Sequence, residues 1–272
     1  MIPRMLLRLG LLAAACSAFG CAPAPEAPTE LVDLSLFFFS DFDTADEELF
    51  GDAFLNLEQA IHASADLDGS RPDRQWELAP LREEHLGGAT APEGEDPEDQ
   101  VTMGLARRSP HAVADHVGLI LIEDQAPLDP SAPQYDRTFT AGADCFAGRG
   151  CELLEATNAI TKSNLLLEVA YEAPKVWRHV TLPDGRAAVA ARTWNPEKNV
   201  GEQGINSIDQ TYSVDLFFED PDDPAACIRF FTLWSAVTIS IDANEALIRS
   251  TMALGTESLM SRHDDHLADA AR

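Results

Sequence analysis

The chain has 272 residues, of which 45% are hydrophobic, and its 46 acidic residues outweigh 19 lysines and arginines to give a formal net charge of −27. This composition excludes a disordered chain of low hydrophobicity and a membrane protein with many spans. It also excludes a nucleic-acid partner, because affinity for phosphate backbones comes largely from lysine and arginine.

Residues 1–20 have the pattern of an export signal. Arg4 and Arg8 precede an apolar run over residues 9–20, which is too short to span a bilayer as a stable helix. The run ends at Cys21, and residues 22–30 begin with the proline-rich sequence APAPEAP, which predicts a stiff, extended tether. This arrangement resembles a bacterial lipoprotein signal.

The resemblance implies that the signal is cleaved before Cys21 and that this cysteine carries the lipid chains, including palmitate, that anchor the protein. Ala22 resembles the residue found in lipoproteins sent to the outer membrane. Cys16 is a rival lipidation site, and an ordinary secretory signal is the alternative reading.

The first elements of the domain are a strand and a helix. Residues 31–39 form an apolar run rich in β-forming residues, so we expect a strand. Thr44 and Glu47 then have the spacing of a capping box for a helix. The apolar stripe of this helix comprises Leu49, Phe50, Ala53, Phe54, Leu57, Ala60 and Ile61.

The middle of the chain is less regular. Residues 66–74 are rich in turn-forming residues, and residues 76–86 fit either a short helix or a strand. Residues 87–100 contain no large apolar residue, so we expect a mobile acidic surface loop. Ser109 and Pro110 predict the start of a brief helix, and strands are expected over residues 117–122 and 135–140.

From Leu165 onward the pattern is strongly β. Residues 165–172 alternate as a half-buried strand does, and Asp184-Gly185 predicts a hairpin between strands over residues 175–182 and 186–194. A polar loop follows over residues 195–206. The next strand has one apolar face, made by Tyr212, Val214, Leu216 and Phe218.

The chain then closes with a strand and a long helix. Residues 228–241 are apolar on both sides, which is typical of a central strand. Asp242 and Glu245 form a second capping box, and the helix is expected to run to about residue 267. Its apolar residues at helical spacing are Leu247, Ile248, Met252, Leu259 and Met260.

This order predicts a single α+β domain over residues 31–270, with a curved antiparallel sheet, an N-terminal helix and a long C-terminal helix. In element order alone it is similar to the helix-grip (START-like) architecture. That resemblance implies a hydrophobic cavity between the sheet and the C-terminal helix. A closed lipocalin-like barrel and a plain sheet with two helices on one face are the alternatives.

Export implies an oxidising compartment, where cysteines can pair. Two glycines between Cys145 and Cys151 let the chain bend back, which predicts a disulfide between them. Cys227 opens an apolar strand, so we expect a buried, unreactive thiol.

No motif in the sequence indicates an enzyme or a cofactor. The chain lacks a Gly-x-Ser-x-Gly elbow, a phosphate-binding glycine loop and a His-Glu-x-x-His site. His263 and His266 have the spacing of a metal pair, but a polar helix end is usually solvated, and we expect no metal site. Arg178, Arg192 and Arg229 lie within apolar strands, and a buried arginine needs a partner, so we expect one or two of them to meet a carboxylate of the protein or of a ligand.

The leading hypothesis is therefore a non-enzymatic envelope lipoprotein that binds an apolar or amphipathic ligand. Aromatic residues gather in the C-terminal sheet, and the candidates for lining a pocket are Trp177, Trp194, Tyr212, Phe230 and Trp234. The alternatives are a scaffold that docks another envelope protein, and an enzyme with a dispersed site.

Overall fold

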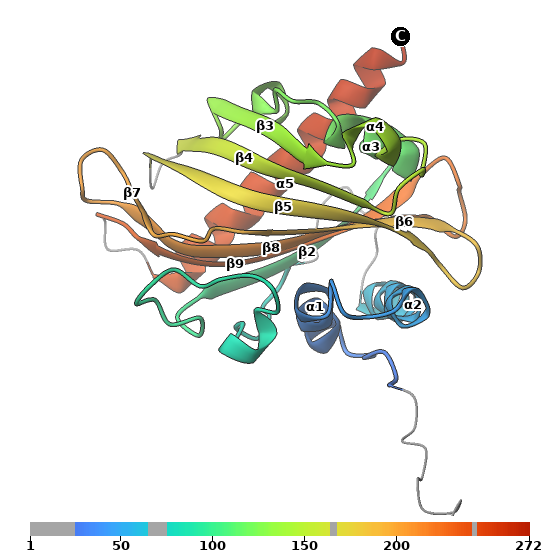
Figure 1. The fold of residues 1–272 in the computed structure, drawn as a ribbon, viewed down its shortest axis with the longest axis horizontal. Helices are drawn as coiled ribbons and strands as arrows, with labels where there is room; N and C mark the ends of the chain where they lie inside the picture. Colours follow the sequence, from blue (N-terminus) through green and yellow to red (C-terminus); the bar gives the residue numbers. More distant parts are fainter. Residues whose placement is uncertain (1–24, 65–74, 164–167, 241–243) are drawn as a thin grey trace, which may run out of the picture.

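A nine-stranded antiparallel sheet dominates the fold (Figure 1). The computed structural model describes residues 25–64, 75–163, 168–240 and 244–272. The strands follow one another across the sheet in the order β1-β2-β9-β8-β6-β5-β4-β3, with β7 paired to β8. Their bounds are β1 Gln75–Trp76, β2 Val101–Ser109, β3 Gln134–Ala141, β4 Leu153–Ser163, β5 Glu168–Thr181, β6 Ala187–Trp194, β7 Asn199–Val200, β8 Ser207–Glu219 and β9 Cys227–Thr238.

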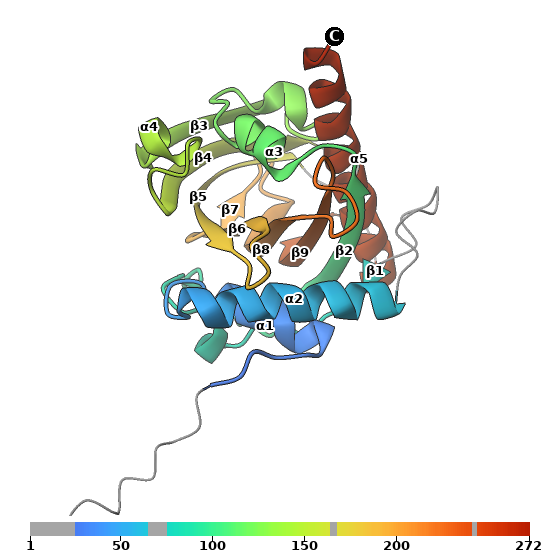
Figure 2. The ribbon, with the colours of Figure 1, turned by 90° about the vertical axis from the view of Figure 1, so that its right-hand side faces the viewer.

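Helices cover both sides of this curved sheet (Figure 2). The bounds of the helices are α1 Leu31–Ser40, α2 Glu47–Ser64, α3 Val113–Ile120, α4 Ala143–Phe146 and α5 Glu245–Ala270, with short 3-10 turns η1 Glu83–His85 and η2 Ala126–Leu128. Helices α1 and α2 pack on the outer, convex face, whereas α3 and α5 lie on the inner face, which we call the concave face. The predicted α+β class with a long C-terminal helix on a curved sheet is confirmed.

The C-terminal half of the sheet agrees with the sequence-based expectations. The hairpin joins β5 to β6 through Gly185, whose φ of 89° suits a residue without a side chain. Strand β9 lies between β2 and β8, so its expected central position is confirmed. The apolar face expected for β8 is buried against the α1 and α2 layer.

The expected strand over residues 31–39 is wrong, because this segment forms α1. A continuous apolar run does not reveal its period, and the helix lets it bury residues on several sides at once. Phe38 packs on α2, with its ring centroid 4.9 Å from that of Phe54. Phe39 meets the sheet instead, with ring centroids 5.6 Å from Tyr212 and 5.9 Å from Trp234.

Residues 117–122 do not form the expected strand either; most of them belong to α3, which begins at Val113 rather than next to Pro110. Val113, Val117 and Ile120 share one helix face and are buried against the sheet. The helical period of this segment is not evident in the sequence, because polar residues lie between Val113 and Val117.

Both helix caps lie two residues beyond the expected position. Asp46, not Thr44, caps α2, since its Oδ1 accepts a hydrogen bond from the Leu49 amide at 2.8 Å. Asn244 caps α5 through the Leu247 amide at 2.9 Å, and Asp242 lies outside the described residues. The expected apolar stripe of α5 is narrower than predicted, because Leu247 is 45% exposed.

Strand β5 is one long strand where two were expected. Its pairing with β6 begins only at Lys175, so Pro174, which lacks an N–H, lies where β5 has a neighbour on one side. Strands β2 and β4 were not anticipated.

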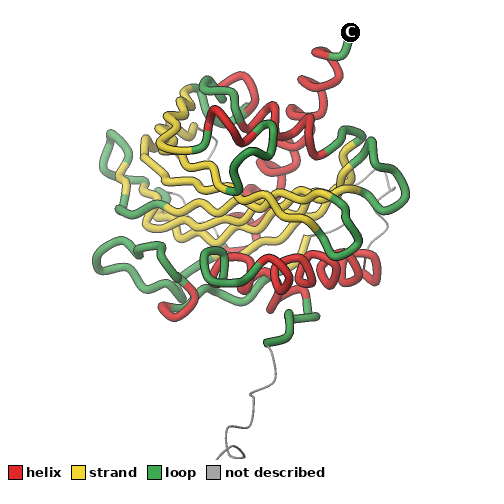
Figure 3. Tube along the Cα trace, turned by 45° about the vertical axis from the view of Figure 1, so that its right-hand side comes forward, coloured by secondary structure: helices red, strands yellow, loops and turns green. Residues whose placement is uncertain are grey.

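Three further expectations concern the chain outside the sheet. Residues 87–100 contain no helix or strand, as expected (Figure 3). An ion pair between Glu95 and Lys198 ties this loop to the body of the protein. Cys16, Cys21 and the turn-rich residues 66–74 lie outside the described residues. Within the described ranges, no helix has the length and apolar character needed to cross a membrane.

Candidate functional site

The two faces of the sheet differ in how completely they are covered. On β8 the convex-face residues Tyr212 and Val214 are fully buried, whereas Thr211 and Ser213, which point to the concave face, are only half-buried. On β9 Phe231 is also half-buried on the concave side, where it packs against a core cluster that includes Ala253 and Met260 of α5. Helices α1 and α2 therefore seal the convex side of β8 and β9, whereas the concave side of β8 stays accessible, although it is a central strand.

Arg229 of β9 is the most deeply buried cation of the concave face, with 1% of its surface exposed. Its guanidinium packs 4.5 Å from the Phe217 ring centroid and donates through Nη1 to His263 Nδ1 of α5 at 3.2 Å. The nearest carboxylate atom is Asp215 Oδ1 at 3.6 Å, too far for a good hydrogen bond. Within the described residues, Nε and Nη2 of Arg229 and Oδ1 of Asp215 make no hydrogen bond.

Two more cations come from the strands opposite. Lys175 of β5 lies 5.3 Å from the Trp177 ring centroid and has no hydrogen bond or ion pair to another described residue. Arg137 of β3 packs on the same ring at 4.7 Å, and its donors reach neutral acceptors, including Asn158 Oδ1 at 2.9 Å. Burial lowers the pKa of Lys175, and Asp215 is the carboxylate that acts against this effect.

Helix α5 supplies a second polar group beside these cations. Ser109 Oγ donates to Asp264 Oδ1 at 2.6 Å and lies 2.9 Å from His116 Nε2. Arg107 pairs with the same aspartate at 3.1 Å. Burial, reinforced by the charge of Arg229, lowers the pKa of His116 to about 2, so its ring is neutral and donates to Ser109 through Nε2.

A serine, a histidine and an aspartate thus meet, but not in the order that makes a nucleophile. In a catalytic triad the carboxylate holds the imidazole, which takes the serine proton. Here the carboxylate of Asp264 takes the hydroxyl hydrogen bond itself, and Ser109 is fully buried. The cluster therefore fastens α5 to β2 and α3.

One end of the concave face is apolar. Val169 of β5 and Ile208 of β8 are buried there, with half-buried Tyr171 and Val237 packed on them. Tyr171 precedes Lys175 by four residues, so both side chains point to the same face of β5. The concave face therefore runs from an apolar end, past the cations, to the closed core beneath α3.

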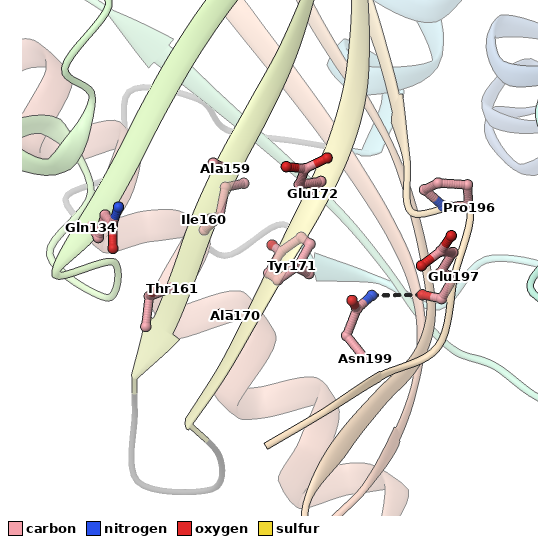
Figure 4. A pocket seen from close by; sticks show the side chains of 10 residues that line it. All are labelled: Gln134, Ala159, Ile160, Thr161, Ala170, Tyr171, Glu172, Pro196, Glu197 and Asn199. Carbon is pink, nitrogen blue, oxygen red and sulfur yellow. Dashed lines mark hydrogen bonds between the residues drawn. The ribbon is translucent and has the colours of Figure 1, made fainter. Parts of the chain in front are cut away.

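A hollow of about 450 Å³ adjoins this apolar end (Figure 4). It lies where β6 has ended and β5 faces the segment that leads to β7, with Tyr171 and Glu172 on one side and Pro196 and Glu197 on the other. Asn199 Nδ2 donates to Glu197 O at 2.6 Å and holds that segment in place.

The five predicted pocket residues do not share one face. Trp177 lies on the concave face, beside Lys175 and Arg137. The other four lie on the convex side, in the core under α1 and α2 or packed against it: Trp194, Tyr212, Phe230 and Trp234. Whether any of the five contacts a ligand stays a prediction.

Sequence reasoning named Arg229 but missed Lys175, Arg137 and Asp215. The signal available was a charged residue at an inward position of an alternating strand, as in the series Tyr171, Ala173, Lys175 and Trp177. The alternation was missed because the sequence-based prediction divided β5 into two strands around Pro174.

The other two buried arginines have carboxylate partners on the convex side. Arg178 pairs with Glu152 at 2.9 Å and donates to two backbone carbonyls, which include that of Ala45 at 3.0 Å. Arg192 pairs with Asp43 at 2.5 Å. These arginines connect the sheet to the segment between α1 and α2.

The expected disulfide and the expected burial of Cys227 are confirmed, while the two C-terminal histidines lie in different environments. Cys145 and Cys151 form the predicted disulfide, with their Cα atoms 5.5 Å apart. Cys227 is buried and unpaired, and burial raises the pKa of its thiol to about 12. His263 points to Arg229 and His266 is exposed; among the described residues, no three metal-ligating side chains gather.

No protein-family model and no curated protein matches the chain. Some solved structures resemble it in fold at low identity. A STAR-related lipid transfer protein from Xanthomonas axonopodis is 12% identical, over 61% of this chain and 85% of its own, with a TM-score of 0.42. A protein from Thermus thermophilus is 15% identical, over 63% and 99%, with a TM-score of 0.41. The human StarD13 lipid transfer and protein localization domain is 10% identical, over 60% and 75%, with a TM-score of 0.38.

Proposed function

We propose that this chain is an exported lipoprotein of the outer membrane whose concave face binds an apolar or amphipathic small molecule without transforming it. The observation that carries the ligand-binding proposal is the unequal cover of the sheet. Residues such as Thr211 and Ser213 remain half-buried on the concave side of a central strand that is sealed on its other side. Partly apolar surface that is curved inward and not filled by the protein's own core is typical of a ligand site.

The anchor is supported by the N-terminal sequence. Ten residues from Cys21 to Glu30 precede α1, and a fully extended chain of that length reaches roughly 35 Å. A lipid on Cys21 would hold the domain close to the bilayer, where amphipathic molecules are concentrated.

Native mass spectrometry of the detergent-extracted, full-length mature protein tests both parts. The intact mass of the denatured protein reports acylation, and small molecules released on denaturation report the bound ligand. We expect a mass that begins at an acylated Cys21 and a released amphipathic molecule. An unacylated mass would refute the anchor, and a protein with no small molecule bound, even after incubation with amphiphiles, would refute ligand binding.

Paired variants locate the lipid. Cys21→Ser should abolish the acyl mass, whereas Cys16→Ser should retain it, because residue 16 lies in the part of the signal that is removed. The reverse result would assign the anchor to Cys16.

A further inference from the structure

We infer that the concave face holds an anion subsite, in which Lys175 and Arg229 bind the carboxylate or phosphate head of an amphipathic ligand. This inference rests on the proposed ligand-binding function and adds the chemical class of the ligand. The ligand's apolar part would lie toward Val169 and Tyr171, at the apolar end of the same face.

The first support is the unmet bonding of Arg229. A buried guanidinium is costly unless its charge is paired and its N–H groups are hydrogen-bonded. Arg229 is 1% exposed, yet Nε and Nη2 donate to no described residue and the Asp215 carboxylate remains 3.6 Å away. An anion with two oxygens would accept from these donors in the bidentate geometry that arginine favours.

The second support is an excess of positive charge in this place. Lys175 and Arg137 have no ion pair with any described residue, and Asp215 is the carboxylate that faces Lys175 and Arg229. The Asp264 carboxylate, which belongs to α5, is already paired with Arg107. The chain as a whole has a net charge of −27, so an excess of positive charge at this place is a local feature and does not reflect the overall composition.

The third support is the position of Lys175. Its strand pairing places it in register with Thr193 of β6, and Thr193 is in register with Ser213 of β8. These side chains share the concave face and are half-buried, so they line a polar floor that solvent can reach. The ammonium group lies beside Trp177 and makes no hydrogen bond of its own to a described residue. The charge of Arg229 acts on it, so the head of a ligand bound between the two would meet both cations.

Charge and polarity together therefore favour an anionic amphiphile. A neutral apolar ligand would leave the donors of Arg229 unsatisfied, and a cation would be repelled by Lys175, Arg137 and Arg229. The concave face is apolar at one end and carries cations in its middle, so it matches a ligand with one apolar tail and one charged head.

A competition experiment tests the inference. The full-length mature protein in detergent is mixed with equal concentrations of decanoate and decanol, which share a chain length and differ in charge, and the bound fractions are read by native mass spectrometry. We expect a preference for decanoate that falls about tenfold in Lys175→Gln, as for a lost charge-assisted hydrogen bond. Lys175→Arg should restore it, and decanol binding should persist in both variants.

Lys198→Gln is the matched control, because it removes the same charge from an exposed site that faces Glu95 and Asp209. It should leave the preference unchanged. Equal binding of decanoate and decanol to the unmodified protein, or an unchanged preference in Lys175→Gln, would overturn the anion subsite while ligand binding stands. Displacement of decanoate by an equal concentration of acetate would assign the site to free small anions instead of a lipid head, and so overturn the inference. If neither amphiphile binds, the proposed function itself fails.

Discussion

Replacing Phe38 by alanine tests the packing that makes the concave face the accessible one. The assignment of the ligand to that face depends on α1 and α2 sealing the other. Phe38 is fully buried, and its ring centroid lies 4.9 Å from that of Phe54 and 5.1 Å from that of Phe50, in edge-to-face geometry. Its side chain therefore joins α1 to α2.

Truncation of such a side chain costs the lost transfer free energy and the free energy of the cavity left behind, together about 4 kcal/mol. That is a large part of the roughly 5–15 kcal/mol by which domains are typically stable. We therefore expect a large fall in the free energy of unfolding for Phe38→Ala, with the protein still folded in the absence of denaturant.

Urea unfolding of the mature protein, followed by tryptophan fluorescence, measures this change. Trp234 reports directly, because it contacts α1 through Phe39 at 5.9 Å between ring centroids. Leu254→Ala is the control: this α5 leucine is 62% exposed, so its truncation should alter stability by no more than about 0.5 kcal/mol. A cost for Phe38→Ala as small as that of the control would refute the packing of α1 and reopen the convex face as a site.

Three further predictions concern the cysteines and a buried histidine. Replacing Cys145 and Cys151 by serine should lower stability by about 2 kcal/mol, as closure of a short loop predicts; an unchanged urea midpoint would show that the bridge contributes nothing. Cys227 should resist iodoacetamide at pH 8 in the folded protein, because burial raises its pKa to about 12, and should react once urea unfolds the chain; rapid native labelling would contradict its burial. His116 keeps a pKa of about 2 in the folded state against 6.5 when unfolded, so the unfolded chain binds the extra proton below pH 6.5. On its account stability should fall as the pH is lowered, by about 0.7 kcal/mol per pH unit at pH 6.5 and about 1.3 kcal/mol per pH unit near pH 5. His116→Gln, which keeps an N–H donor for Ser109, should reduce that slope by the same amount, and an equal slope in both proteins would refute the lowered pKa.

A large part of this fold can be predicted from local signals in the sequence. The helix stripe of α2, the Asp184-Gly185 hairpin, the one-sided face of β8 and the central position of β9 all follow from periodicity or turn chemistry. The disulfide follows from the glycines between its cysteines. Each of these features depends on residues that are close together in the chain, so the local sequence is enough to predict it.

The tertiary structure decided what continuous apolar runs become and which side chains meet. Residues 31–39 are helical because α2 and the sheet bury them from different directions, which no local period records. Aromatic residues that looked alike in sequence divide between the two faces, with Trp177 on one and Tyr212 on the other. Lys175 and Arg229 stand on β5 and β9, which β6 and β8 separate in the sheet, yet the charge of Arg229 acts on Lys175 across the concave face. Strand order and sheet curvature depend on contacts between distant segments, so the sequence alone does not reveal a charge cluster that they assemble.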